Sequence, residues 1–62
     1  MTSPAQYASL RRQWAAARDR SRRAAHLGDR AGSIIAAGDA RNVLDRLNAA
    51  TVADMTERSA AR

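Results

Sequence analysis

Apolar and small side chains recur at alternating intervals of three and four residues through the first half of the chain. The positions in this seam are Tyr7, Leu10, Trp14, Ala17, Ser21 and Ala24. Such spacing is typical of an amphipathic helix with one narrow buried face. Because the seam begins with large residues and ends with small ones, we expect a neighbouring helix to approach most closely near Ser21 and Ala24.

Signals for both ends of this first helix flank the seam. Ser3 suits the N-cap, Pro4 suits the first helical position, and Gln6 suits the third position of a capping box. Gly28 follows the seam and can adopt the left-handed conformation that ends many helices. The sequence therefore predicts a helix over residues 4–27.

A second helix is expected over residues 33–59, after a turn at residues 28–32 that contains two glycines and an aspartate. Ser33 is the expected N-cap, and Asp39 is a later alternative. The expected buried face of this helix carries Ala37, Ala40, Leu44, Leu47, Thr51 and Met55. A glycine inside a helix costs about 1 kcal/mol relative to alanine, so a break into a third helix near Gly38 is the alternative.

These elements predict an all-α fold for residues 1–62 as a single domain, an antiparallel two-helix hairpin. The strict alternation of apolar and polar residues that indicates strands does not occur. Of the 28 hydrophobic residues 16 are alanine, which leaves 12 large apolar side chains. A chain of this length buries only about 60% of the surface that its unfolded form exposes, and the absence of cysteine excludes disulfides. We therefore expect oligomerisation or a partner to complete the hairpin.

The large apolar residues form the candidate protein interface. Its expected members are Tyr7, Leu10, Trp14, Leu44, Leu47 and Met55. Ile34 and Ile35 lie outside the expected buried face, so they either cover the end of the hairpin or form an exposed docking point. The predicted function is that of a small non-catalytic helical interaction module. It would act as a homo-oligomer, or as a subunit or regulator bound to a larger protein.

Positive charge is concentrated in the first helix. Residues 1–28 contain six arginines and one aspartate, whereas residues 29–62 contain five arginines and five acidic residues. Arginines on a helix can bind phosphates or an acidic protein surface. The candidate contacts of this kind are Arg11, Arg12, Arg18, Arg22 and Arg23. Nucleic-acid binding is thus the alternative function, and a solvated arginine face produced by codon bias is the simplest explanation of the charge.

One motif offers a weaker form of the nucleic-acid hypothesis. Ala24, Gly28 and Ile34 have the A-x3-G-x5-I spacing of the DNA-binding helix-turn-helix unit. Against this interpretation, the helix after the turn offers few side chains for reading bases. The positive charge also lies before the turn, where that unit needs it least.

The residue types required for catalysis or metal binding are scarce. The chain has one histidine, His26, and no cysteine, which argues against a zinc site. Ser21 lies near His26 in sequence, but a two-helix hairpin offers no enclosed pocket for nucleophilic catalysis. We expect no enzymatic activity, no cofactor, no metal and no small-molecule substrate.

The expected location is the cytoplasm. The longest strongly apolar run, residues 34–37, is far shorter than the roughly 20 residues of a membrane-spanning helix. No signal-peptide core follows the first residues, and binding of the basic first helix to an anionic membrane surface is the least favoured of the three functional alternatives. The length and composition also fit a small accessory protein of a phage or mobile element.

Overall fold

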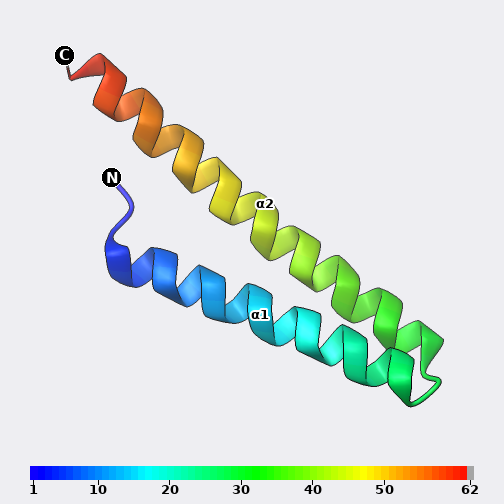
Figure 1. The fold of residues 1–62 in the computed structure, drawn as a ribbon. Coiled ribbons are helices and arrows are strands. Elements are labelled where there is room, and N and C mark those ends of the chain that lie inside the picture. Colours follow the sequence, from blue (N-terminus) through cyan, green and yellow to red (C-terminus); the bar gives the residue numbers. More distant parts are fainter. Residues whose placement is uncertain (62) are drawn as a thin grey trace.

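The computed structural model describes residues 1–61 and contains two helices within them (Figure 1). Helix α1 covers Pro4–His26 and helix α2 covers Arg30–Ala60. The two helices run antiparallel, because the start of α1 contacts the end of α2 and the end of α1 contacts the start of α2. The predicted all-α hairpin is confirmed. Its principal dimensions are 52 × 17 × 10 Å.

The first turn of α1 forms the predicted capping box. Ser3 Oγ accepts a hydrogen bond from the Gln6 backbone N–H at 3.2 Å. In return, Gln6 Oε1 accepts one from the Ser3 backbone N–H at 2.8 Å. Pro4 occupies the first helical position, where its missing N–H needs no partner. Local sequence alone thus determines where α1 begins.

The turn is shorter than predicted, and α2 begins three residues earlier, at Arg30 instead of residue 33. Gly28 has φ +78°, and the N–H groups of Gly28 and Asp29 donate to the carbonyls of Ala25 and Ala24. This pair of bonds is a Schellman motif, which satisfies the last carbonyls of α1. The N-cap of α2 is Asp29, whose Oδ1 accepts from the backbone N–H of Gly32 at 2.9 Å. The expectation that Ser33 caps this helix was wrong, because Asp29, directly after the left-handed Gly28, is already the N-cap of α2.

Helix α2 continues through Gly38 without a break, so the three-helix alternative was wrong. Ala36 and Ala40 on either side of Gly38 are 6% and 7% exposed. Packing of these alanines against α1 offsets the weak helix propensity of the glycine. Gly38 itself faces open space, since a Cβ added there would meet no atom within 4 Å.

Alanine substitution is expected to have opposite effects at Gly28 and Gly38. Gly38→Ala should stabilise the fold by about 0.5–1 kcal/mol, because it lowers the entropy of the unfolded chain without a clash. Gly28→Ala should destabilise it by about 1–2 kcal/mol, because L-residues are strained at positive φ. Urea unfolding followed by circular dichroism measures both, and each variant is the control for the other. Equal effects of the same sign would contradict this account of the turn.

The contact face of α1 is the predicted one. Ala17 is 1% exposed, and the other five seam residues are half-buried. The contact face of α2 differs from the prediction, because Val43 and Ala36 are buried while Ala37, Thr51 and Met55 are exposed. The observed inner positions follow a three-four spacing: Ser33, Ala36, Ala40, Val43, Leu47, Ala50 and Asp54.

The helices approach most closely near the turn, as the change from large to small seam residues predicted. Ser21 Oγ donates a hydrogen bond to the backbone carbonyl of Ser33 at 3.0 Å and lies 3.4 Å from Ser33 Oγ. A short side chain on α1 reaches the backbone of α2 only where the helix axes are close. The ribbons diverge from the turn toward the termini (Figure 1), where the seam carries Trp14, Leu10 and Tyr7.

Candidate functional site

A buried carboxylate joins the start of α1 to the far end of α2. Asp54 is only 4% exposed. Tyr7 Oη donates a hydrogen bond to Asp54 Oδ2, and the Thr2 backbone N–H donates to Oδ1 at 2.9 Å. The N-terminal ammonium of Met1 lies 3.2 Å from Glu57 Oε2, one turn further along α2. Both oxygens of Asp54 therefore have a donor, which is the usual condition for burying a charged group.

These contacts shift the pKa values of the two side chains in opposite directions. The hydrogen bond from Tyr7, followed by that from the Thr2 backbone, lowers the pKa of Asp54, while burial opposes the shift. The hydrogen bond to Asp54, together with burial, raises the pKa of Tyr7. Sequence spacing alone would pair Asp54 with Arg58, four residues later. The structure places Asp54 against α1 instead, so this cluster is a structural clamp on the N-terminal segment.

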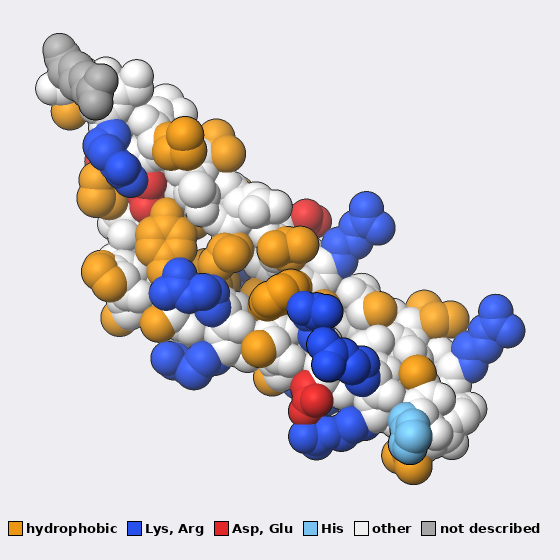
Figure 2. All heavy atoms as spheres, viewed as in Figure 1, with side chains coloured by type: hydrophobic (Ala, Val, Ile, Leu, Met, Phe, Trp, Pro, Cys, Tyr) orange, Lys and Arg blue, Asp and Glu red, His pale blue; other side chains and the backbone are white. Residues whose placement is uncertain are grey.

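One side of the interhelical seam forms an apolar groove bordered by arginines, called here the tryptophan groove. Its volume is about 360 Å³, and it is lined by Trp14, Arg18, Ser21, Arg22, Ala37, Ala40, Arg41 and Leu44. The guanidinium of Arg18 lies over the Trp14 ring, 4.7 Å from its centroid. This cation–π contact holds one arginine at the edge of the groove. Figure 2 shows basic side chains next to apolar ones along the line between the helices.

The opposite side of the seam carries a groove of similar size but mixed charge. Its volume is about 350 Å³, and it is lined by Gln13, Ala16, Ala17, Arg20, Asp39, Asn42, Val43 and Arg46. Arg20 Nη2 lies 4.0 Å from Asp39 Oδ2, so one of its arginines already faces an acidic side chain of the other helix. Among residues 1–61, no acidic side chain lines the tryptophan groove. The two grooves therefore differ in the charged residues that line them: arginines alone in the tryptophan groove, and arginines with an aspartate in the opposite groove.

Helix α2 also carries an outer apolar stripe, formed by Ile34, Ala37, Leu44, Val52 and Met55. Ile34 and Val52 are 18 residues apart, or about five turns, and so point in the same direction. They are 63% and 62% exposed, and Met55 is 60% exposed. Ala37 and Leu44 belong both to this stripe and to the lining of the tryptophan groove. The stripe therefore extends the groove along α2 toward both ends of the helix.

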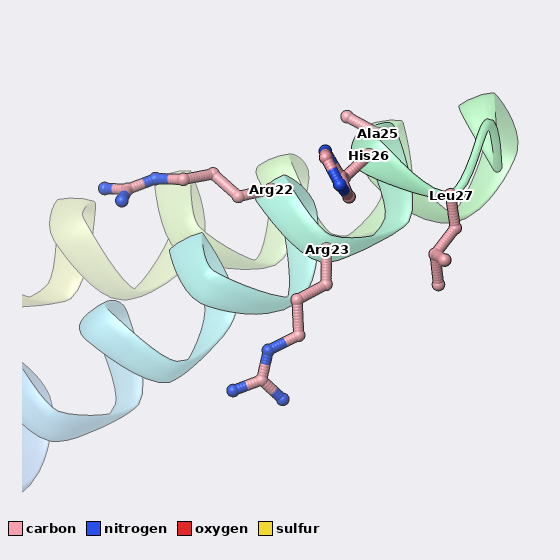
Figure 3. Close-up of a pocket in the computed structure, with 5 residues that line it drawn as sticks. All are labelled: Arg22, Arg23, Ala25, His26 and Leu27. Carbon is pink, nitrogen blue, oxygen red and sulfur yellow. The ribbon is translucent and has the colours of Figure 1, made fainter.

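A further hollow lies at the end of α1 and has a volume of about 750 Å³. Figure 3 shows its lining residues, Arg22, Arg23, Ala25, His26 and Leu27, whose side chains spread in different directions from one helix end. Helix α2 contributes no lining residue, and all five residues are exposed. Ser21 is hydrogen-bonded to Ser33, on the seam. This hollow therefore does not bring a nucleophile and a base together.

Within the described residues, no group of three or more histidine or acidic side chains gathers to bind a metal. Neither α1 nor α2, over residues 1–61, has the length and apolarity needed to cross a membrane.

Comparison with protein families, characterised proteins and solved structures finds no match to this chain.

The residues predicted for a protein interface divide into two sets. Tyr7, Leu10, Trp14, Leu44 and Leu47 are half-buried between the two helices, so each has part of its surface left for a partner. Met55 is exposed on the outer stripe. Ile34 and Ile35, for which the sequence left two interpretations, are 63% and 67% exposed.

The arginines that were predicted to contact nucleic acid or an acidic partner lie in different surroundings. Arg18 and Arg22 border the tryptophan groove, and Arg11 lies two turns before Arg18 on the same side of α1. Arg23 forms an ion pair with Asp19. Arg12 is exposed and is absent from the lining of either groove.

The residues with helix-turn-helix spacing, Ala24, Gly28 and Ile34, lie around the turn. The helices on either side of it run antiparallel, with contacts at both ends. The DNA-binding unit instead requires helices at about 90–120°. This arrangement gives the motif no support.

Sequence reasoning missed Asp54 and Arg41. Asp54 continues the inner spacing of Leu47 and Ala50 on α2, and this position is the only sequence signal that it faces α1. Arg41 joins Arg18 and Arg22 only after the two helices are paired in register. No pattern along one helix could have placed it there.

Proposed function

We propose that this chain is a small non-catalytic helical interaction module, which acts as a homo-oligomer or as a subunit or regulator bound to a larger protein. The supporting observation is the composition of its core. The buried apolar residues are Ala17, Ala36, Ala40 and Val43, whereas six large apolar side chains are exposed. These six are Met1, Leu27, Ile34, Ile35, Val52 and Met55.

The accessible surface supports the same proposal quantitatively. The hairpin exposes 4838 Å². A compact protein of 6.7 kDa is expected to expose roughly 3,900 Å². The excess of roughly 900 Å² is close to the roughly 800 Å² that each partner buries in a standard protein interface. One partner of ordinary size would therefore bring the exposed surface into the range of compact proteins.

The test is the solution mass of the purified chain, measured by light scattering over a dilution series, with circular dichroism on the same samples. A helical dimer or tetramer that dissociates and loses helicity on dilution is the result expected of a homo-oligomer. A poorly folded monomer is the result expected of a subunit that needs another protein. A monomer that stays helical and unfolds cooperatively at every concentration would contradict the proposal.

A double substitution sharpens the measurement. Ile34→Gln with Val52→Gln removes two apolar side chains from one side of α2 and introduces residues of better helix propensity. For a homo-oligomer that forms through that side, self-association should weaken although intrinsic helicity rises. Ala31→Gln with Ala49→Gln is the matched control, since both alanines are exposed on α2 and have the same separation.

Nucleic-acid binding is the second candidate function, and the positive charge bordering the tryptophan groove favours it. Arg18, Arg22 and Arg41 line the groove without an acidic residue. Phosphate binding requires these arginines but gives no role to the apolar floor between them. A protein partner uses both features, and is therefore the first proposal.

A further inference from the structure

The tryptophan groove combines an apolar floor with positive edges on both sides. Trp14, on α1, and Leu44, on α2, are large apolar residues that line it and stay half-exposed. Arg18 and Arg22 border it from α1, and Arg41 borders it from α2. A ligand lying in this groove would therefore meet apolar surface along its centre and guanidinium groups along both edges.

The shape of the site suits a third helix. Two antiparallel helices leave an elongated groove on each side, and a helix placed there completes a three-helix bundle. On α2 the outer stripe prolongs the apolar floor from Ile34 to Met55, which are 21 positions apart, or about 30 Å along the helix. A bound helix of similar length would cover Trp14 and Leu44 and would reach Val52 and Met55, which are 62% and 60% exposed.

The charges decide which helix would bind. A second copy docked through the same face would oppose the three groove arginines of one copy to those of the other, which is unfavourable at short range. The opposite groove contains Asp39 facing Arg20, so it has less unneutralised charge to direct a partner. Carboxylates on both edges of a bound helix would match Arg18 and Arg22 on one side and Arg41 on the other.

We infer that the tryptophan groove binds an acidic amphipathic helix of another protein. Apolar residues of that helix occupy the floor at three-four spacing, and Asp or Glu residues flank them on both sides. This inference rests on the proposed function as an interaction module and specifies the chemistry of its partner. The module could also associate through other surfaces. A failure of the inference about the tryptophan groove would therefore leave the proposed function standing.

A designed peptide of about three heptads tests the inference. Leucine occupies its seam positions, and glutamate occupies the positions on both sides of the seam. A second peptide carries lysine at every glutamate position, and polyglutamate supplies the charge without the apolar seam. The fluorescence of Trp14, the only tryptophan, reports binding, and isothermal titration gives the affinity and stoichiometry.

The expected result is saturable one-to-one binding of the acidic peptide, with a blue shift of Trp14 fluorescence. The lysine peptide and polyglutamate should bind at least about tenfold more weakly, because they lack the charge match and the apolar contact respectively. Equal binding of the glutamate and lysine peptides, or no binding of either, would overturn the inference. Light scattering of the chain alone still tests the proposed function in that case.

Substitutions locate the site. Replacing Arg18, Arg22 and Arg41 together by glutamine should weaken binding of the acidic peptide by about tenfold or more, since three partly exposed ion pairs are lost. The control replaces Arg20 and Arg46 of the opposite groove by glutamine and should change binding by less than about threefold. Circular dichroism confirms that helicity is retained, and the peptide comparison on the unmodified chain does not depend on any variant folding.

A duplex DNA fragment separates the two classes of partner. Binding of DNA that falls steeply with salt and needs Arg18, Arg22 and Arg41, together with weak binding of the acidic peptide, would overturn the inference in favour of nucleic acid. Preference for the acidic peptide over DNA at physiological salt would support it. Equal loss of peptide binding in the triple variant and in the control variant would show that the peptide binds by net charge alone, and would also overturn it.

Discussion

Replacing Ala17 by leucine is expected to destabilise the hairpin by about 2 kcal/mol, the typical effect of inserting methylene groups into a tightly packed core. Ala17 is 1% exposed, the lowest value among the buried apolar residues. It lies one turn before Ser21, whose hydroxyl reaches the backbone of α2 at 3.0 Å. A leucine at this position must push the helix axes apart, and that separation also breaks the hydrogen bond of Ser21. Leucine carries more apolar surface than alanine, and its burial alone would be stabilising, so a loss of stability would report how closely the two helices pack at this position.

Urea unfolding at a fixed protein concentration measures this effect. Ala15→Leu is the matched control, because Ala15 lies on the same helix, is exposed and undergoes the same change in side chain and propensity. Its free energy of unfolding should change by less than about 0.5 kcal/mol. If the two variants had the same stability, the alanine contact between α1 and α2 would not be the core of the fold.

Replacing Asp54 by alanine is expected to release the N-terminal segment from α2 and to lower the melting temperature. The substitution removes the acceptor of the Tyr7 hydroxyl and of the Thr2 backbone N–H, and both donors lose their partner in the seam. Asp45→Ala is the control, since Asp45 is an exposed aspartate in the same helix. Thermal unfolding and amide exchange at Thr2 measure the effect. A melting temperature and exchange rate equal to those of Asp45→Ala would contradict the role of Asp54 as a clamp.

The same substitution should change how stability depends on pH. The pKa of Asp54 is lowered in the folded state, chiefly by the Tyr7 hydrogen bond. Its contribution is therefore present above the unfolded pKa of about 3.9 and is lost as the pH falls through the folded value. The pKa of Tyr7 is raised by its bond to Asp54. The contribution of Tyr7 is complete below the unfolded pKa of about 10 and is lost as the pH rises through the folded value. Asp54→Ala should reduce both losses, whereas Asp45→Ala should leave the alkaline loss unchanged.

The sequence predicted the parts of the fold that depend on neighbours along the chain. The capping box of Ser3 and Gln6, the seam of α1 and the role of Gly28 all follow from spacings of a few residues, and the structure confirms them. The start of α2 was misplaced because Asp29 and Ser33 are both suitable N-caps. Choosing between them requires the geometry of the left-handed turn that precedes Asp29.

The contact face of α2 was misassigned because that helix has two apolar stripes. The prediction assigned Leu44 and Met55, which belong to the outer stripe, to the buried face. The two helices are so close that the smaller residues Ala36 and Val43 are buried instead. A buried aspartate in the seam could not be inferred from α2 alone, since its donors, Tyr7 and Thr2, lie about 50 residues away in sequence. Part of the candidate site was predictable, because Arg18 and Arg22 are one turn apart. The contribution of Arg41 depends on the register between the helices.

The contacts at the two ends of the seam differ in the length of chain that each one closes. The contact of Ser21 with Ser33 closes a loop of 12 residues, whereas that of Tyr7 with Asp54 spans 47. Loop-closure entropy makes the second contact about 1.2 kcal/mol more costly to form from an open chain. This entropy difference favours pairing that begins at the turn and proceeds toward the termini. The contacts of Tyr7 and Thr2 with Asp54 then close the far end of the seam, and the contact of Ser21 with Ser33 fixes the register beside the turn.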